Sequence, residues 1–154
     1  MKDKDLQALI EHLRQNLGDR LDAVVLFGSR ARGEATEESD WDLLIIVKDL
    51  PRSPLARQRL WLSIAPREWA IWASPLLRTP EEWYRHISSL TLDIALDGLV
   101  LYDAQARMKS FLDKVRLALQ KTGLRRIRKG REMLWLPVRP GKRPWYKVLR
   151  EAIT

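Results

Sequence analysis

Two short, uninterrupted apolar runs restrict the fold more than any other feature of the chain. Residues 23–27 read Ala-Val-Val-Leu-Phe, and residues 43–47 read Leu-Leu-Ile-Ile-Val. Strands buried on both faces carry such continuous runs, whereas half-exposed strands alternate apolar and polar residues. Both runs are bounded by polar segments, so they predict two buried strands in a sheet that helices cover. We therefore expect an α/β (α+β) fold with a mixed central β-sheet flanked by helices.

The rest of the pattern supplies those helices and a C-terminal region of different character. Residues 3–17 have leucine and isoleucine at helical spacing and end before Gly18, a typical helix stop. Residues 79–82 read Thr-Pro-Glu-Glu, the chemistry of a helix start. Turn residues at 139–142 predict a hairpin, and its prolines favour an edge position. We also expect helices at residues 55–63, 83–87, 90–96 and 104–122, a strand at residues 69–73 that Pro75 closes, and an edge strand at residues 99–102. The expected hairpin strands are residues 133–138 and 145–149.

The charge of the chain is divided unevenly. The formal net charge is +8, but residues 1–103 hold 13 Lys/Arg against 17 Asp/Glu, while residues 104–154 hold 15 Lys/Arg against 3 Asp/Glu. A segregated positive segment suits an anionic partner, either nucleic acid or an acidic protein face. The alternative is a solvated helix face, which we favour for residues 104–122. For the denser run that follows we favour binding, and the candidate contact residues are Arg125, Arg126, Arg128, Lys129 and Arg131.

Length and composition set further bounds. At 154 residues the chain fits one domain of ordinary size, and its 45% hydrophobic and 31% charged content is typical of a globular protein. With no cysteine, disulfides and thiolate metal sites are excluded, so a metal would need carboxylate oxygens or one of the two histidines. The N-terminal residues lack an apolar segment, and no run approaches the ~18 apolar residues that span a bilayer. These features predict a cytoplasmic protein without a membrane segment.

A candidate anion site follows the first apolar run. Residues 28–33 read Gly-Ser-Arg-Ala-Arg-Gly, which places glycine and a hydroxyl between a buried strand and a predicted helix. Backbone N–H groups at such a helix start bind anions, and Gly28 lets a phosphate approach the backbone closely. Arg30 and Arg32 add positive charge. The alternative is a plain glycine turn with Ser29 as a helix cap, and this segment alone does not decide between them.

A candidate metal site precedes the second apolar run. Asp40 and Asp42 flank Trp41 at the predicted start of that strand. Because side chains alternate along a strand, the two carboxylates converge while Trp41 points away. Paired carboxylates before an apolar run are costly to bury without a cation, and Mg²⁺ takes one or two carboxylates together with substrate phosphates. Residues 30–39 are long enough for a helix and turn that bring both half-sites to one sheet edge.

Together, residues 28–33 and 39–43 resemble the signature of the polymerase-β-type nucleotidyltransferase superfamily, specifically its small "minimal nucleotidyltransferase" members. The order of elements over residues 1–103 is similar to those proteins as well, whereas residues 104–154 fall outside the signature. The resemblance implies a nucleotidyltransferase core at residues 1–103, and from the charge and the pattern we expect residues 104–154 to form a basic extension, a helix plus a β-hairpin packed on that core. The resemblance also implies that Asp40 and Asp42 bind Mg²⁺ (or Mn²⁺). It implies further that ATP or another NTP is held by Gly28, Ser29, Arg30 and Arg32.

One position departs from the family pattern. The family usually adds a third catalytic carboxylate on a later strand, but the predicted strand at residues 69–73 has no acid, which leaves Glu68 at its start as the nearest candidate. If no acid occupies that place, the chain is a slow enzyme, a one-metal enzyme or a nucleotide-binding protein without activity.

The resemblance implies transfer of an NMP, in particular AMP, to a macromolecular hydroxyl, with a HEPN-type toxin as the expected protein partner in a toxin–antitoxin pair. The alternative is a catalytically weak or inactive module that binds RNA or a protein through the basic C-terminal segment. The sequence leaves open which NTP is used and whether the chain forms homo-oligomers.

Overall fold

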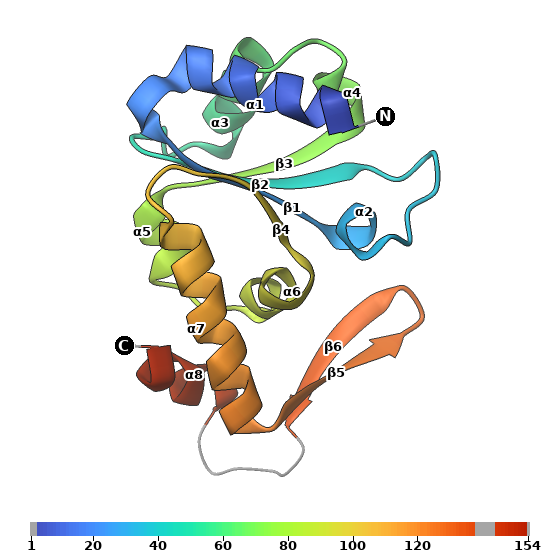
Figure 1. The fold of residues 1–154 in the computed structure, drawn as a ribbon, viewed down its shortest axis with the longest axis vertical. Coiled ribbons are helices and arrows are strands. Elements are labelled where there is room, and N and C mark those ends of the chain that lie inside the picture. Colours follow the sequence, from blue (N-terminus) through green and yellow to red (C-terminus); the bar gives the residue numbers. More distant parts are fainter. Residues whose placement is uncertain (1–2, 138–143, 154) are drawn as a thin grey trace.

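The computed structural model describes residues 3–137 and 144–153, which form a central sheet between two layers of helices and a separate hairpin (Figure 1). The helices are α1 (Asp3–Leu17), α2 (Gly28–Arg32), α3 (Pro54–Ile64), α4 (Trp69–Trp72), α5 (Pro80–Tyr84), α6 (Ser89–Asp97), α7 (Arg107–Thr122) and α8 (Trp145–Ile153), with a 3-10 turn, η1, at Gly18–Arg20. The strands are β1 (Leu21–Phe27), β2 (Trp41–Val47), β3 (Ala73–Arg78), β4 (Leu99–Asp103), β5 (Leu124–Lys129) and β6 (Glu132–Pro137).

The four-stranded sheet has the order β3-β2-β1-β4. Strand β1 pairs antiparallel with both β2 and β4, whereas β2 and β3 are parallel, so the sheet is mixed. The two apolar runs are the two inner strands, and β4 lies at an edge as expected. The predicted α/β fold with a mixed sheet flanked by helices is therefore confirmed.

Alternate residues of the inner strands face different helical layers. Leu43 and Ile45 belong to a core cluster with residues of α1 and α3, and Leu44 and Ile46 belong to a second cluster with residues of α6 and α7. All four side chains have no exposed surface. Figure 1 shows α1 and α3 on one side of the sheet and α5, α6 and α7 on the other. Burial on both faces explains why these strands lack the alternation of a half-exposed strand.

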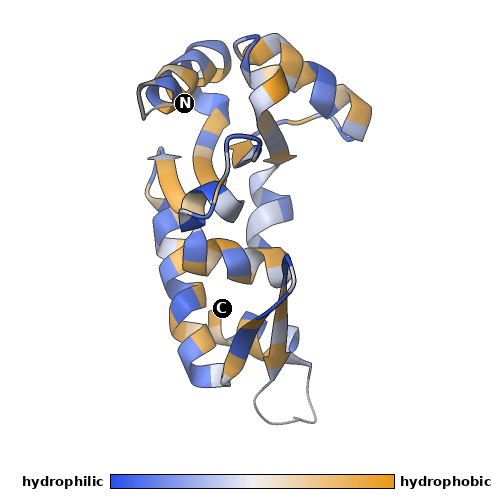
Figure 2. Ribbon diagram, turned by 90° about the vertical axis from the view of Figure 1, so that its right-hand side faces the viewer, coloured by the Kyte–Doolittle hydropathy of each residue, from blue (hydrophilic) through white to orange (hydrophobic). Residues whose placement is uncertain are grey.

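The C-terminal elements pack on the second layer. Helix α7 buries Met108, Phe111, Leu112 and Val115 in the same cluster as the Leu44 side of the sheet, and α8 adds Leu149. Strands β5 and β6 pair only with each other and extend below α2 (Figure 1). Figure 2 shows hydrophobic and hydrophilic residues mixed along the helices, and β5 as a mostly hydrophilic strand.

The prediction of a strand at residues 69–73 is wrong. Residues 69–72 form the short helix α4, and the strand begins at Ala73 and runs through Pro75 to Arg78. Pro75 indicated a strand end, but an edge strand tolerates proline on its unpaired side. Trp69 is buried and packs edge to face on Trp41, with ring centroids 6.0 Å apart. This aromatic contact fixes α4 against the sheet.

The predicted pairing of the hairpin is also wrong. Residues 145–149 lie in helix α8, where Trp145, Leu149 and Ile153 recur at helical spacing. The expected strand at 133–138 corresponds to β6, but its partner is β5, formed by the basic run itself. Gly130, with φ of +65°, permits the tight turn between them. The turn expected at residues 139–142 lies outside the described residues.

Among residues 3–137 and 144–153, none of the helices has both the length and the apolar character that crossing a membrane requires.

Candidate active site

The turn from β1 into α2 builds the first half of the site. Phe27 is extended, Gly28 has φ of +74°, and one short helical turn ends at Gly33, which also has φ of +74°. The backbone N–H of Glu34 donates to the Ser29 carbonyl oxygen at 3.0 Å and closes this turn. In the described residues no side chain caps the start of α2. No side chain in the described part of the chain therefore occupies the first backbone N–H groups of α2, which is the arrangement that an anion site at a helix start requires.

Gly28 also makes room for Asp42. The two strands place Phe27 opposite Asp42, so the carboxylate reaches back over the start of α2. A Cβ built on Gly28 would lie 2.1 Å from Asp42 Oδ2 and 3.0 Å from Asp42 Cγ. No side chain fits there while the carboxylate keeps its place. The glycine of the candidate phosphate site and the aspartate of the candidate metal site therefore pack directly against each other.

Burial and the charge of Asp40 both oppose ionisation of Asp42. Burial raises the pKa of Asp42 above its ordinary value, the negative charge of Asp40 raises it further, and the positive charge of Arg32 partly offsets both. Asp40 precedes β2 and is exposed. A divalent cation would relieve this repulsion, and two carboxylate oxygen donors suit a hard ion such as Mg²⁺. The chemistry of this donor pair therefore fits the metal that the sequence predicts.

Arg30 makes hydrogen bonds to the segment that carries Asp40. Its Nε and Nη2 donate to the Ser39 carbonyl oxygen at 3.2 Å and 2.8 Å, and its guanidinium lies 4.5 Å from the centre of the Trp41 ring. Arg30, Asp40 and Trp41 also line a cavity of about 530 Å³ together with Trp72. In this arrangement the guanidinium is held on the segment before β2.

Arg32 lies on the opposite side of α2. Its Nη1 is 3.6 Å from Asp97 Oδ2 and its Nε is 3.5 Å from Glu34 Oε2, with only 20% of the side chain exposed. Its positive charge also acts on Asp42, whose pKa it lowers against the effects of burial and of Asp40. Of the two predicted nucleotide-binding arginines, Arg32 is thus the one whose positive charge lowers the pKa of Asp42.

Glu68 does not complete a carboxylate triad. It is an exposed residue at the N-terminus of α4, ahead of the true strand β3. The residue of β3 that pairs with Asp42 is Ser74, and β3 contains no acid. Over the described ranges, no three His, Cys, Asp or Glu side chains are grouped as a metal-binding cluster.

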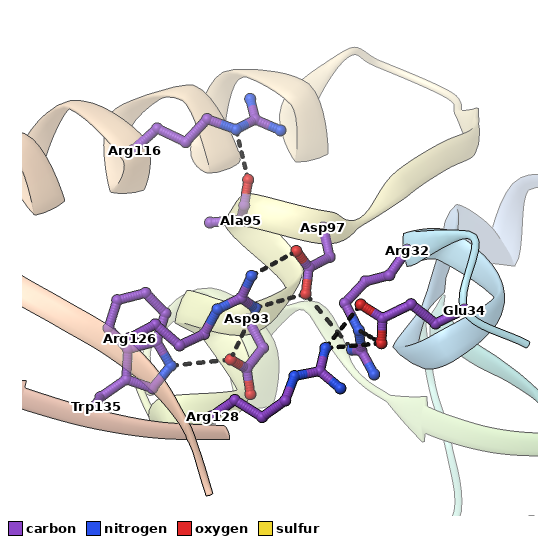
Figure 3. Close-up of polar contacts among 9 residues, drawn as sticks. All are labelled: Arg32, Glu34, Asp93, Ala95, Asp97, Arg116, Arg126, Arg128 and Trp135. Carbon is purple, nitrogen blue, oxygen red and sulfur yellow. Dashed lines mark hydrogen bonds and ion pairs between the residues drawn. The ribbon is translucent and has the colours of Figure 1, made fainter. Parts of the chain in front are cut away.

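The basic run is partly neutralised inside the chain (Figure 3). Arg126 binds Asp97 through both terminal nitrogens, Nη1 to Oδ2 at 2.5 Å and Nη2 to Oδ1 at 2.8 Å, and Arg128 Nη2 lies 2.7 Å from both carboxylate oxygens of Glu34. The other three candidate contact residues, Arg125, Lys129 and Arg131, are exposed.

Sequence reasoning missed the acids that bind these arginines. Asp93 and Asp97 stand four residues apart on helix α6, whose other residues are mostly apolar, which is a signal that cationic side chains face them. Their partners are about thirty residues away in the chain, so the sequence did not identify the pairs.

The comparisons with known proteins identify the class. Residues 6–102 match the profile of the nucleotidyltransferase domain family, and the chain belongs to that family. It is a nucleotidyltransferase, and this family uses a nucleoside triphosphate with a divalent metal ion. The matched region ends before α7, so the hairpin lies outside it.

Two relatives come from the archaeon Methanocaldococcus jannaschii. The chain is 31% identical over 120 residues to the protein named "Putative protein adenylyltransferase MJ1305", which covers 75% of this chain and 82% of the relative. It is 45% identical over 64 residues to "Putative protein adenylyltransferase MJ0141", which covers 40% of this chain and 63% of that relative.

Two solved structures share the fold. One is a toxin–antitoxin crystal structure with AMP-PNP, of which one chain aligns with a TM-score of 0.51 at 22% identity and covers 75% of this chain and 87% of that chain. The other is a tri-AMPylated Shewanella oneidensis HEPN toxin in complex with an MNT antitoxin, with a TM-score of 0.50 at 22% identity, covering 79% and 88%. The profile match therefore confirms the predicted nucleotidyltransferase family, and these structures confirm the predicted fold.

Proposed function

We propose that this chain transfers AMP from ATP to a hydroxyl group of a partner protein. The observation that carries the proposal is the seating of the Asp42 carboxylate on Gly28, which joins the phosphate-binding turn to the carboxylate pair. Relatives named as protein adenylyltransferases support AMP as the transferred group and protein as the acceptor. The HEPN toxin in the complex of similar fold supports a HEPN-type toxin as the partner.

In this proposal each residue has a defined task. Backbone N–H groups at Gly28 and the Ser29 hydroxyl bind the β- and γ-phosphates, and Arg32 offsets negative charge on the departing pyrophosphate. Asp40 and Asp42 would hold Mg²⁺, which when bound neutralises phosphate charge as the α-phosphorus reacts. We assign Arg30 to holding the segment before β2, and through it Asp40, in position.

The transfer forms one bond and breaks one. The acceptor oxygen bonds to the α-phosphorus, the bond from that phosphorus to the bridging oxygen breaks, and pyrophosphate leaves. The acceptor proton passes to water, because β3 offers no carboxylate beside Asp42. A positioned general base contributes typically 10²–10⁴-fold to rate. We therefore expect slow turnover compared with family members that have a third acid.

The decisive experiment is label transfer. The purified chain is incubated with ATP labelled at the α-phosphate, with Mg²⁺ or Mn²⁺ and with a HEPN-type toxin, and protein-bound label is measured. Asp40→Asn and Asp42→Asn should each abolish labelling. Asp19→Asn is the matched control and should label normally. Asp19 is an exposed carboxylate just before the start of β1, whereas the site follows the end of that strand. Label that persists in both site variants would reject the assigned site.

We also propose the division of the chain into a nucleotidyltransferase core at residues 1–103 and an extension at residues 104–154. The extent of the family match supports the first boundary. The burial of α7 residues in the cluster that includes β1 and β2 supports packing of the extension on the core.

A second hypothesis is RNA binding through the hairpin, motivated by exposed Arg125, Lys129 and Arg131. It predicts salt-sensitive binding that survives loss of both aspartates. The binding of Arg126 and Arg128 to acids within the chain reduces the charge available to RNA, so we favour the enzyme.

A further inference from the structure

Two carboxylates join the C-terminal hairpin to α2 (Figure 3). Asp97 accepts two hydrogen bonds from Arg126 of β5 and lies 3.6 Å from Arg32 Nη1 of α2. Glu34 binds Arg128 of β5 at 2.7 Å and lies 3.5 Å from Arg32 Nε. Each acid therefore lies between one arginine of the family core and one arginine of the hairpin.

The two bridges differ in burial. The side chains of Arg126 and Asp97 are 18% and 10% exposed, and Asp93 adds a second carboxylate that also accepts from Trp135 Nε1 at 2.9 Å. The side chains of Arg128 and Glu34 are 48% and 42% exposed. Exposed ion pairs contribute little to stability, whereas a bidentate, shielded pair holds its geometry. Arg126 thus anchors the hairpin, and Arg128 is free to exchange partners.

The exchangeable pair is next to the phosphate-binding turn. The backbone N–H of Glu34 donates to the Ser29 carbonyl oxygen at 3.0 Å, so Glu34 is fixed to the residue to which we assign the phosphates. The Arg128 guanidinium, bound to the Glu34 side chain, is therefore held beside the C-terminal end of α2. This arginine lies about a hundred residues from Ser29 in sequence and outside the matched family region.

We propose that Arg128 is a triphosphate-binding residue of the nucleotide site, which leaves Glu34 for the phosphates of bound ATP, while Arg126 and Asp97 position the hairpin for this exchange. The inference rests on the proposed function, in which Gly28 and Ser29 hold the triphosphate. A planar guanidinium binds phosphate oxygens in the same forked geometry as a carboxylate, and a triphosphate carries more charge than Glu34. In the chain without nucleotide, Glu34 then competes with the triphosphate, because it binds Arg128 and contacts Arg32 Nε.

The test measures binding of ATP with Mg²⁺ to the full chain by isothermal titration calorimetry. Arg128→Ala should weaken binding about tenfold, the scale of one lost charge-assisted hydrogen bond. Arg59→Ala, at an exposed arginine of α3 for which the described part of the chain offers no ion pair, should bind ATP like the unchanged protein. Glu34→Gln should tighten binding severalfold, because it removes the competing charge.

The double variant separates direct binding from an indirect effect. If Arg128→Ala acted only by exposing the charge of Glu34, it would have no effect in the Glu34→Gln background. We expect the full loss of about tenfold there as well. Thermal melting of each variant checks that the fold is retained.

Three results would overturn the inference. They are normal ATP binding by Arg128→Ala, no effect of Arg128→Ala in the Glu34→Gln background, and weaker binding by Glu34→Gln alone. In each case binding by the unchanged protein leaves the proposed function standing. Failure of the unchanged protein to bind ATP with Mg²⁺ would remove the proposed function and this inference together.

Discussion

Replacement of Gly28 by alanine tests the central contact of the site. The new Cβ would lie 2.1 Å from Asp42 Oδ2, so the carboxylate must move by more than about 1 Å to reach an ordinary contact distance. Misplacement of a reacting group by about 1 Å can cost on the order of 10²-fold in rate. We expect Gly28→Ala to lower AMP transfer by at least that factor and to weaken the dependence of ATP binding on Mg²⁺.

Gly33→Ala is the matched control. Both glycines have φ of +74°, but no atom lies within 4 Å of a Cβ built on Gly33. An alanine in this left-handed conformation costs roughly 1–2 kcal/mol, and each kcal/mol lowers the melting temperature of a domain this size by about 2–4 °C. Both variants should therefore lose similar stability, and only Gly28→Ala should lose activity. Equal activity of the two variants in the label-transfer assay would refute the role of the Asp42 contact.

Two further predictions concern stability. The pKa of Glu82 lies below its ordinary value because hydrogen bonds from Thr79 and Arg57, with the positive charge of Arg57, outweigh the opposing effect of burial. A lowered folded-state pKa stabilises the fold above the unfolded pKa, and this stability is lost as pH falls through the folded value. Glu82→Gln should thus lower the free energy of unfolding by roughly 1 kcal/mol or less at pH 7. In urea titrations this loss should shrink below about pH 4.5, and a loss that does not change with pH would contradict the prediction. Leu112→Ala in α7 should lower the free energy of unfolding by about 2–5 kcal/mol, because that side chain is fully buried. Leu117→Ala on the same helix should lower it by under about 0.5 kcal/mol, because Leu117 is 58% exposed. Equal losses would show that α7 does not pack as described.

Much of the core and the grouping of its two motifs followed from local patterns. The apolar runs at 23–27 and 43–47 predicted strands because both of their faces are covered, and the i, i+2 spacing of Asp40 and Asp42 predicted their mutual proximity. Burial raises the pKa of Asp42 most, and the further rise caused by the charge of Asp40 reflects that proximity. These features depend on residues close together in sequence, for which periodicity is informative.

The errors arose where tertiary context overrides local pattern. Pro75 indicated the end of a strand, yet it lies within β3 because that strand is at the sheet edge. The arginines of β5 indicated a solvated or ligand-binding surface, yet Arg126 faces Asp97 and Asp93 of α6. Periodicity reports contacts between residues close together in sequence, so it does not reveal pairs about thirty positions apart. The sequence shows the acids of α6, but it does not show which arginine binds them.

The strand order has a consequence for how the chain folds. Residues 21–47 contain β1, α2 and β2 without interruption, and β1 pairs directly with β2, so both motifs of the site can come together through short loop closures. The other edge of β1 pairs with β4, which is synthesised some seventy residues later. Arg126 of β5, which anchors the hairpin, follows later still. During synthesis, we expect an early hairpin that already holds Gly28 against Asp42 while one edge of β1 is unpaired. That exposed apolar edge is the point at which an incomplete chain is most prone to aggregate.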